Sequence, residues 1–498
     1  MTARRFGRAW LWFAAAMLAT VGASPLPAAA QDATVPGYHG GNDRAGHSVV
    51  PGLTAQTASR TRRDDHFEVV LPSGSHAQPL FWHPPGGGRD LVIVATDDDH
   101  VVALDAQSGQ TIWQRRLGRP ASRAEVSCGN LNPVGVTGTP VIDAAAGDLY
   151  LDAMVDHAGA ARHMVFGLSL KDGAVLPGWP IAVADALRRR GERFIDRVQE
   201  QRGALALADG RVYVPFSGYF GDCGPYHGRV LAFDTARPSL AASWATRGAK
   251  GGIWAPAGIV SDGQSIIFVT GNTAGVSQWQ DGEAVFRLDP GLRRTGDAAS
   301  FFTPSNWKDL DDDDLDLGGT NATLIDLPGA QFLLALGKDG DAYLLNRAHL
   351  GGIGRALVTA PVADTPIRSA TARFRVGRDE IVVVQAHGPS CPGERGLLAL
   401  RVSASPEPAV ARAWCAPLDG QGTPIVTTSD TTADPLVWVL GAVGDDRLHA
   451  FDGNDGKPVF ASDALPRITQ FASILVAARR FYVVAGTRLV AFDLPPSP

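Results

Sequence analysis

The stretch VVALDAQSGQTIW, residues 101–113, contains the pattern that decides the fold. An apolar run ends at Leu104-Asp105, a turn contains Gly109, and Trp113 follows on the far side. An apolar run, a glycine-containing turn and a second run are typical of two antiparallel strands. The segment therefore predicts a β-hairpin.

The same phrase recurs along the rest of the chain. Further copies begin at Val165, Val230, Val285, Ala342, Leu397, Leu448 and Leu489. An apolar, strand-like run precedes each of these, for example DLYLDAMV at 148–155. Starts separated by 41 to 65 residues leave room for four strands and variable loops in each repeat. The repeat predicts an all-β fold, an eight-bladed β-propeller of four-stranded antiparallel blades.

The two ends of the chain are expected to meet in the last blade. The eighth copy stops at Pro495-Pro496, before a fourth strand could form. Since a ring leaves no free edge only when its last blade is completed, we expect the N-terminal strand at 66–71 (HFEVVL) to close it. The expected organisation is a signal peptide at 1–30, a leader at 31–65 and the propeller at 66–498.

The N-terminal residues are typical of an export signal. Three arginines precede an apolar run, and Ala28-Ala29-Ala30 supplies small residues for cleavage. Removing these arginines changes the net charge from −6 to −9, so nucleic acid is not an expected partner. The apolar run is short for a bilayer span, and we expect no membrane span in the mature chain. The expected location is the periplasm or outside the cell.

The four cysteines suit an oxidising compartment. Sequence order favours the pairs Cys128 with Cys223 and Cys391 with Cys415, although three pairings are possible and buried free thiols are the alternative. No C-x-x-C-H occurs, so no covalently attached haem is expected.

Two inserts interrupt the repeat. Residues 184–200 carry apolar residues at helical spacing, which predicts a helix of about four turns on one loop. Residues 306–316 are interpreted as an acidic loop.

The phrase at 103–113 resembles the tryptophan-docking repeat of pyrroloquinoline-quinone (PQQ) propellers, in which the Trp packs between blades. That repeat also occurs in propellers without a cofactor, among them outer-membrane assembly scaffolds. A more specific resemblance, to quinoprotein alcohol dehydrogenases, begins at 251–273 (GGIWAPAGIVSDGQSIIFVTGNT). It implies that Trp254 is the floor for the quinone and that Asn272 is a calcium ligand. A flat ring gains by stacking on an indole, and Ca²⁺ takes oxygen ligands.

Two later segments extend this resemblance. Residues 314–321 (DLDLGGTN) are similar to the family segment that contains the catalytic base, which implies Asp316 as base and metal ligand and Asn321 as a cofactor contact. Residues 337–347 (GKDGDAYLLNR) resemble the phrase whose Lys or Arg contacts the quinone oxygens, which implies Lys338.

The first half of the chain departs from the family pattern. Cys128 is followed by Gly129 instead of a second Cys, and Val134 stands where the family has Arg. Asp222 is the acidic residue of 217–228 that could replace the family's calcium-ligating Glu.

The resemblance leaves two hypotheses. One is an exported PQQ- and calcium-dependent dehydrogenase that oxidises an alcohol or sugar hydroxyl and passes electrons to a separate acceptor. The other is a non-catalytic scaffold or binding propeller with an envelope protein as partner. His39, His47 and His66 are interpreted as loop histidines, not metal ligands.

Overall fold

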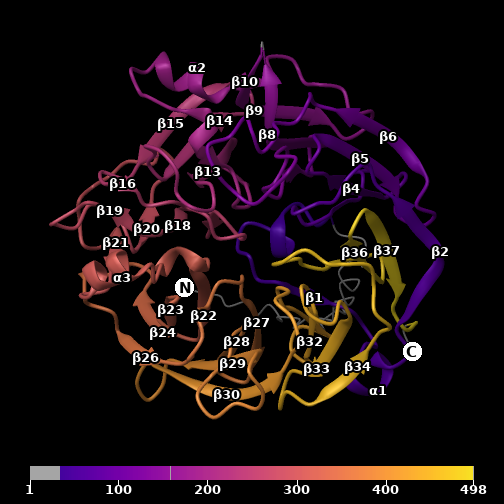
Figure 1. Ribbon diagram of the computed structural model, residues 1–498. Coiled ribbons are helices and arrows are strands. Elements are labelled where there is room, and N and C mark those ends of the chain that lie inside the picture. The colour runs from indigo at the N-terminus through magenta and orange to yellow at the C-terminus, as the bar shows by residue number, and fades with distance from the viewer. Residues whose placement is uncertain (1–33, 158, 497–498) are drawn as a thin grey trace, which may run out of the picture. The chain divides into compact units, whose positions relative to one another are not determined.

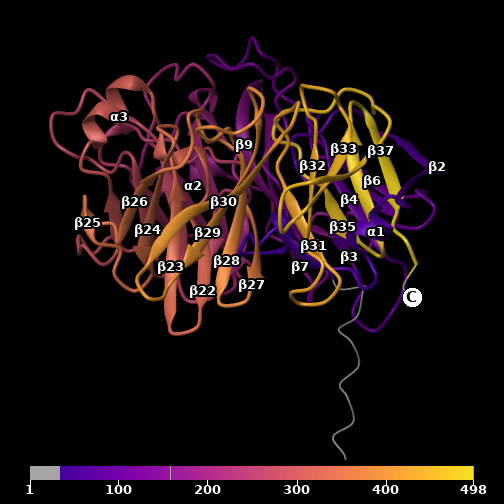
Figure 2. The same cartoon turned by 90° about the horizontal axis from the view of Figure 1, so that it is seen from below.

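The computed structural model describes residues 34–157 and 159–496, which form eight blade sheets around a central axis (Figure 1 and Figure 2). A further two-stranded sheet pairs β16 (Ala249–Lys250) with β19 (Thr273–Ala274). Blade 1 contains β3 (Leu80–Trp82), β4 (Leu91–Ala95), β5 (His100–Asp105) and β6 (Thr111–Arg116). Blade 2 contains β7 (Val141–Asp143), β8 (Asp148–His157), β9 (Ala160–Ser169) and β10 (Ile181–Ala182). Blade 3 contains β12 (Ala206–Ala208), β13 (Arg211–Gly218), β14 (Arg229–Asp234) and β15 (Ser239–Ala245), and β11 (Gln199–Glu200) also pairs with β13.

The remaining blades follow the same plan. Blade 4 contains β17 (Val260–Ser261), β18 (Ile266–Thr270), β20 (Ala284–Leu288) and β21 (Phe301–Thr303), which β25 (Gly352–Ile353) extends. Blade 5 contains β22 (Thr323–Leu327), β23 (Ala330–Leu336), β24 (Asp341–Asn346) and β26 (Val358–Pro361). Blade 6 contains β27 (Ala372–Val376), β28 (Asp379–Gln385), β29 (Gly396–Ser403) and β30 (Ala409–Pro417). Blade 7 contains β31 (Ile425–Thr428), β32 (Leu436–Leu440), β33 (Leu448–Asp452) and β34 (Pro458–Ala461). Blade 8 contains β35 (Leu475–Ala477), β36 (Arg480–Ala485), β37 (Arg488–Asp493) and β2 (Arg62–Val70). The predicted eight-bladed propeller is confirmed.

The N-terminal strand closes the ring as predicted. β2 pairs with β37 in antiparallel register, with Val69 opposite Leu489 and Glu68 opposite Val490. The strand begins earlier than expected, at Arg62, because a bulge between Arg63 and Glu68 lets its first residues pair as well.

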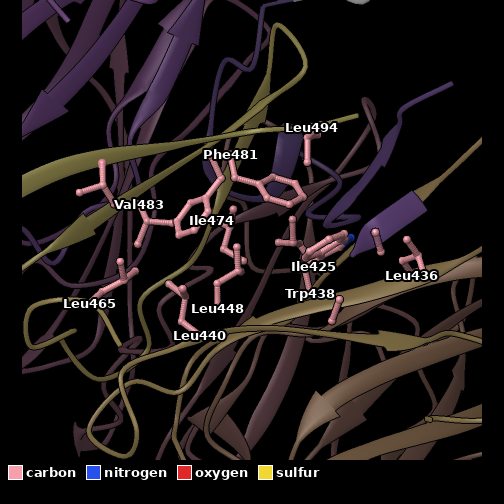
Figure 3. Packing of buried hydrophobic residues seen from close by; sticks show 14 of the residues in the cluster. Ile425, Leu436, Trp438, Leu440, Leu448, Leu465, Ile474, Phe481, Val483 and Leu494 are labelled. Atoms are coloured by element: carbon pink, nitrogen blue, oxygen red, sulfur yellow. The ribbon is translucent and has the colours of Figure 1, made fainter. Parts of the chain in front are cut away.

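Neighbouring blades are joined by tryptophans and apolar clusters. Trp113 Nε1 donates to Leu170 O in the next blade at 2.8 Å, and Trp414 Nε1 donates to Gly453 O at 2.7 Å. Between blades 7 and 8, Trp438 and Phe481 pack with their ring centroids 4.6 Å apart (Figure 3). Fully burying a side chain such as Phe481 stabilises the fold by about 1.5–3 kcal/mol.

The described part of the leader is indigo in Figure 1 and contains η1 (Tyr38–Gly40), β1 (His47–Val49) and α1 (Ala55–Ala58). η1 and β1 lie inside the ring, whereas α1 lies at its outer edge beside β34. β1 runs parallel to β31 of blade 7, and the buried guanidinium of Arg44 donates to Leu205 O and Ile259 O of blades 3 and 4. His39 contacts Thr371 O and Ser473 Oγ, on the way into blades 6 and 8. The leader therefore ties the blades together from within.

The expected four-turn helix at 184–200 is wrong. The structure has α2 (Val183–Arg188) and η2 (Asp196–Val198), separated by Gly191 with a φ of +77°. After the turn, Glu192 accepts hydrogen bonds from Arg229 and Ser243 in blade 3. A left-handed residue and this side-chain anchor keep the chain from continuing as a helix.

The expected acidic loop at 306–316 is also wrong in part, because it contains α3 (Trp307–Asp313) and then η3 (Leu317–Gly319). Leu310 and Asp311 face inward, and Lys308 pairs with Asp312 one turn later. Asp314 ends the helix in a left-handed conformation.

Both disulfides expected from sequence order are present, with Cys128 bonded to Cys223 and Cys391 to Cys415. None of the helices in the described part of the chain is long and apolar enough to cross a membrane. The expected signal peptide lies outside the described residues.

Candidate functional site

Four of the sequence-predicted residues come from loops at one end of blades 4 and 5. Trp254 and Asp316 precede the first strands, β17 and β22, whereas Asn272 and Lys338 follow the second strands, β18 and β23. Because first and second strands are antiparallel, the start of one lies beside the end of the other. The fold thus brings residues 254, 272, 316 and 338 to the same face of the ring.

Asp316 is the centre of this group and is only 4% exposed. Its Oδ1 accepts a hydrogen bond from the Asn272 backbone N–H at 2.8 Å. Its Oδ2 lies 2.5 Å from the Lys338 ammonium, which also contacts Asp314 Oδ1 at 3.1 Å. Both carboxylate oxygens of Asp316 are therefore held in fixed positions.

The indole of Trp254 packs against this ion pair. The Lys338 ammonium lies 5.4 Å from the centroid of the indole. A methyl group built on Gly271 would lie 2.3 Å from Asp316 Oδ1 and 3.3 Å from Trp254 Nε1. Gly271 therefore has to be glycine for Asp316 and the pyrrole end of Trp254 to come this close.

The electrostatics of the site are those of buried carboxyl groups with one partner cation. Burial raises the pKa of Asp316, against the opposing effect of the Lys338 ammonium. Burial also lowers the pKa of Lys338, but the charges of Asp316 and Asp314 outweigh it, so the net pKa is raised. Lys338 therefore stays charged at neutral pH and favours the ionised form of Asp316.

Glu283 is a further member of the site that sequence reasoning missed. It is fully buried in a left-handed conformation with a φ of +51°. Its Oε2 accepts from the Leu317 backbone N–H at 2.5 Å, and its Oε1 has no hydrogen-bond partner among the described residues. Burial first, and then the charge of Asp316, raise the pKa of Glu283 well above its usual value. A sequence signal for Glu283 was available. It stands just before the repeat copy that begins at Val285, in the blade that carries Asn272.

Asn321 is also buried, and it is 2% exposed. Its Nδ2 donates to Ala322 O at 3.4 Å, whereas its Oδ1 has no partner within the described part of the chain. A buried, unpaired amide oxygen is uncommon and suits a ligand that donates a hydrogen bond or a bound water.

Asp222 belongs to a different set of contacts. Its Oδ1 accepts from the Tyr226 hydroxyl at 2.5 Å, and its Oδ2 lies 4.0 Å from the Lys250 ammonium. Among residues 34–157 and 159–496, no group of three or more His, Cys, Asp or Glu side chains is placed to hold a metal ion. With Asp316 held by an ammonium and Asp222 by a phenol, the residues present do not fit a preformed calcium site.

The acidic residue Asp311 has a structural contact. It accepts hydrogen bonds from Thr273 N at 2.7 Å and Thr273 Oγ1 at 2.8 Å. This contact fixes α3 onto the residue that follows Asn272.

Next to these loops on the same face, the loops of blades 2 and 3 are packed with apolar groups. Val134 is buried in a cluster with Met154, Tyr219 and the Cys128–Cys223 disulfide. Val134 therefore packs in this apolar cluster, at the position where the family that the sequence resembles has an Arg.

The comparisons with known proteins agree with the fold. Residues 81–288, blades 1 to 4, match the family model described as outer membrane protein assembly factor BamB. No curated protein matches the sequence. The eight blades confirm the propeller, and within it residues 81–288 match a model of PQQ-like repeats.

Solved structures show the same architecture at low sequence identity. A quinohemoprotein alcohol dehydrogenase from Pseudomonas putida HK5 is 13% identical, with a TM-score of 0.65 over 93% of this chain and 82% of its own. A europium-containing methanol dehydrogenase is 15% identical, with a TM-score of 0.63 over 94% and 99%. BamB from Moraxella catarrhalis is 13% identical, with a TM-score of 0.50 over 86% and 99%. At these identities the likeness shows the fold alone.

Proposed function

We propose that this chain is an exported quinoprotein-type propeller that binds PQQ on Trp254 and oxidises an alcohol or sugar hydroxyl. The observation that carries the proposal is the contact of Asp316, Lys338 and Trp254, since it places a carboxylate, an ammonium and an indole together. The two disulfides suit an oxidising compartment, in keeping with export.

Each group has a distinct role in this proposal. Trp254 supplies a flat surface for a planar ring, and the Lys338 ammonium lies within reach of carbonyl oxygens at the ring edge. PQQ, when bound, would supply the two-electron acceptor.

Asp316 would accept the hydroxyl proton of the substrate at Oδ2. Lys338 favours the ionised form of Asp316, which this step requires. Burial raises the pKa of Asp316 and so makes its carboxylate a stronger base. The Asn272 N–H, bonded to Oδ1, fixes the direction in which Oδ2 points. No step is assigned to calcium, because Asp222 and Asp316 are engaged by Tyr226 and Lys338.

The test is a titration of the full chain with PQQ, monitored by tryptophan fluorescence, followed by dye-linked oxidation of alcohols and sugars. We expect saturable quenching at micromolar PQQ, lost in Trp254→Leu and kept in Trp279→Leu. Trp279 is the matched control because it lies in the same blade but its indole packs against Phe301 and Arg247. An equal loss in both variants, or no saturable quenching of the wild type, would contradict the proposal.

The second candidate is a scaffold of the cell envelope. The observation that favours it is the match of residues 81–288 to the outer membrane assembly factor model. A scaffold would show no PQQ binding and would retain an envelope protein partner in crosslinking of intact cells, with or without Trp254→Leu.

A further inference from the structure

The insert at 183–198 lies at the outer rim of blades 2 and 3 (Figure 1). α2 contacts β9 and β15, and η2 contacts β9 and β11. Beside the insert, β8 and β9 form a hairpin of two ten-residue strands. The insert and the hairpin border a surface cavity of about 460 Å³, a volume typical of small-molecule sites. Its lining comes from the loop before blade 2, the start of β9, α2 and residues 194–197, so the cavity is separate from the group around Asp316.

Phe194 and Ile195 give this cavity an apolar side. The ring of Phe194 packs edge-on against the rings of His163 and Phe216, with centroids 6.0 and 5.2 Å apart. These contacts hold the Phe194 ring in place. The ring therefore offers a fixed apolar surface against which the ring of a ligand can pack.

Two arginines of the lining share one carboxylate. Arg162 Nη1 and Arg188 Nη2 lie 3.0 and 2.9 Å from the same oxygen, Oδ1 of Asp185. Two guanidinium groups on one carboxylate leave an excess of one positive charge at this edge of the cavity. The side chain of Arg188 is 72% exposed, so its other N–H groups are open to a ligand.

Arg197 is a third arginine of the lining, and its charge has no partner. It is exposed, and its side chain forms no ion pair or hydrogen bond within residues 34–157 and 159–496. Its main chain is fixed, because its carbonyl oxygen accepts from the Ser127 N–H at 2.9 Å. A cation is thus held at the cavity without a counter-charge.

The acidic groups of the lining already have partners. Glu125 accepts hydrogen bonds from both Nη atoms of Arg119, and Asp196 Oδ1 accepts from the His163 N–H at 2.9 Å. They form no ion pair with Arg197. Their negative charges nevertheless disfavour a doubly charged anion in the same cavity.

A second cavity, of about 370 Å³ between blades 8 and 1, shows the contrast. Its arginines are Arg89, paired with Asp105, and Arg480, paired with Asp64 and Asp493. Both guanidinium groups there are used within the fold. The cavity beside the insert differs in having an arginine that is not.

We propose that the cavity between the insert and the β8–β9 hairpin binds a small organic carboxylate, with its carboxylate on Arg197 and its apolar ring on Phe194. A guanidinium binds a carboxylate through two parallel hydrogen bonds, which give both affinity and orientation. The excess charge of Arg162 and Arg188 adds to the attraction. This site does not depend on PQQ, and it would serve an enzyme or a scaffold alike.

The test is ligand-observed NMR on the full chain with three probes: cinnamate, its neutral analogue cinnamide, and inorganic phosphate. Arg197→Gln removes the unpaired cation and keeps a polar side chain of similar length. Arg237→Gln is the matched control, because Arg237 is an exposed arginine in the turn between β14 and β15, at the end of blade 3 away from the insert. Trp254→Leu reports whether the aromatic ring binds at the other site instead.

We expect saturable binding of cinnamate, about 10-fold or more tighter than that of cinnamide. Arg197→Gln should weaken cinnamate about 10-fold and leave cinnamide unchanged, whereas Arg237→Gln and Trp254→Leu should change neither. Hydrogen exchange with cinnamate bound should slow at 159–162 and 194–197.

The other outcomes would overturn this site. They are equal binding of cinnamate and cinnamide, no saturable binding of cinnamate at millimolar concentration, or an equal loss in Arg237→Gln. Tighter binding of phosphate than of cinnamate would overturn the choice of a carboxylate. Loss of cinnamate binding in Trp254→Leu, with Arg197→Gln unaffected, would place the probe on Trp254 and overturn the site while leaving the quinone proposal standing.

Discussion

The loops of blades 4 and 5 and those of blades 2 and 3 stand on the same repeat, yet they are built in opposite ways. In the first pair, Asp316 and Lys338 are buried together beside an indole. In the second, the Cys128–Cys223 disulfide and Val134 form an apolar cluster. The difference teaches that the repeat determines the ring, while the chemistry depends on what each loop carries. We call these two regions the polar wall and the apolar wall.

The largest expected effect is on turnover, and it distinguishes Asp316 of the polar wall from Asp222 of the apolar wall. Asp316→Asn should lower dye-linked turnover by about 10²–10⁴-fold, the usual contribution of a general base. Asp222→Asn should change it little, because Asp222 is engaged by Tyr226. Steady-state rates of both variants, with PQQ binding measured in parallel, check this. Equal losses of turnover would mean that the walls do not differ in function.

Removing the disulfide of the apolar wall should reduce stability without affecting PQQ binding. The Cys128–Cys223 bond spans 95 residues and the Cys391–Cys415 bond spans 24. Loop-closure entropy then predicts losses of about 4–5 and about 3 kcal/mol for the two Cys→Ser pairs. Denaturant unfolding of both double variants measures this order. A smaller loss for Cys128→Ser/Cys223→Ser than for the other pair would contradict it.

Blade 2, which carries part of the apolar wall, also contains a buried ion pair between His163 and Asp152. We expect this pair to make stability depend on pH. His163 Nδ1 lies 2.6 Å from Asp152 Oδ2, and Nε2 lies 2.9 Å from Gln199 O. Burial lowers the pKa of His163, but Asp152 outweighs it and the net pKa is raised to about 8.

The folded state then binds more protons than the unfolded state between about pH 6.5 and 8. This stabilisation is complete below the unfolded pKa and is lost as the pH rises through the folded one. We expect the free energy of unfolding to fall by about 2 kcal/mol over this window. Urea unfolding at several pH values should show this fall in the wild type and a flatter profile in His163→Gln. An unchanged slope in the variant would assign the dependence to another group.

The smallest effect is expected from Tyr226→Phe. It removes the hydrogen bond to the half-exposed Asp222 and should cost about 0.5–1.5 kcal/mol of stability. PQQ affinity should be unchanged. A weakening of PQQ binding as large as that of Trp254→Leu would place Asp222 and Tyr226 in the ligand site.

Sequence reasoning predicted the ring because each blade repeats the same local signals. The phrase at 101–113 contains the strand, the turn and the docking Trp of one repeat. The last repeat copy lacks a fourth strand, which predicted that β2 closes the ring. The inserts were predicted less well. Gly191 breaks a helical pattern that the surrounding residues support, and the buried face of α3 depends on contacts with blade 4.

The site was predicted in part for a similar reason. Trp254, Asp316 and Lys338 stand in recognisable phrases, and the fold brings them together. Glu283 stands in no such phrase. Its proximity to Asp316 arises only from the packing of loops that are distant in the sequence.

The most direct test of the polar wall as the ligand site is hydrogen exchange of the full chain with and without PQQ. The account predicts slower exchange at 251–256, 271–273, 316–321 and 337–340, with no change at 128–135 and 217–228. Protection confined to the loops of the apolar wall, or no protection at saturating PQQ, would contradict it.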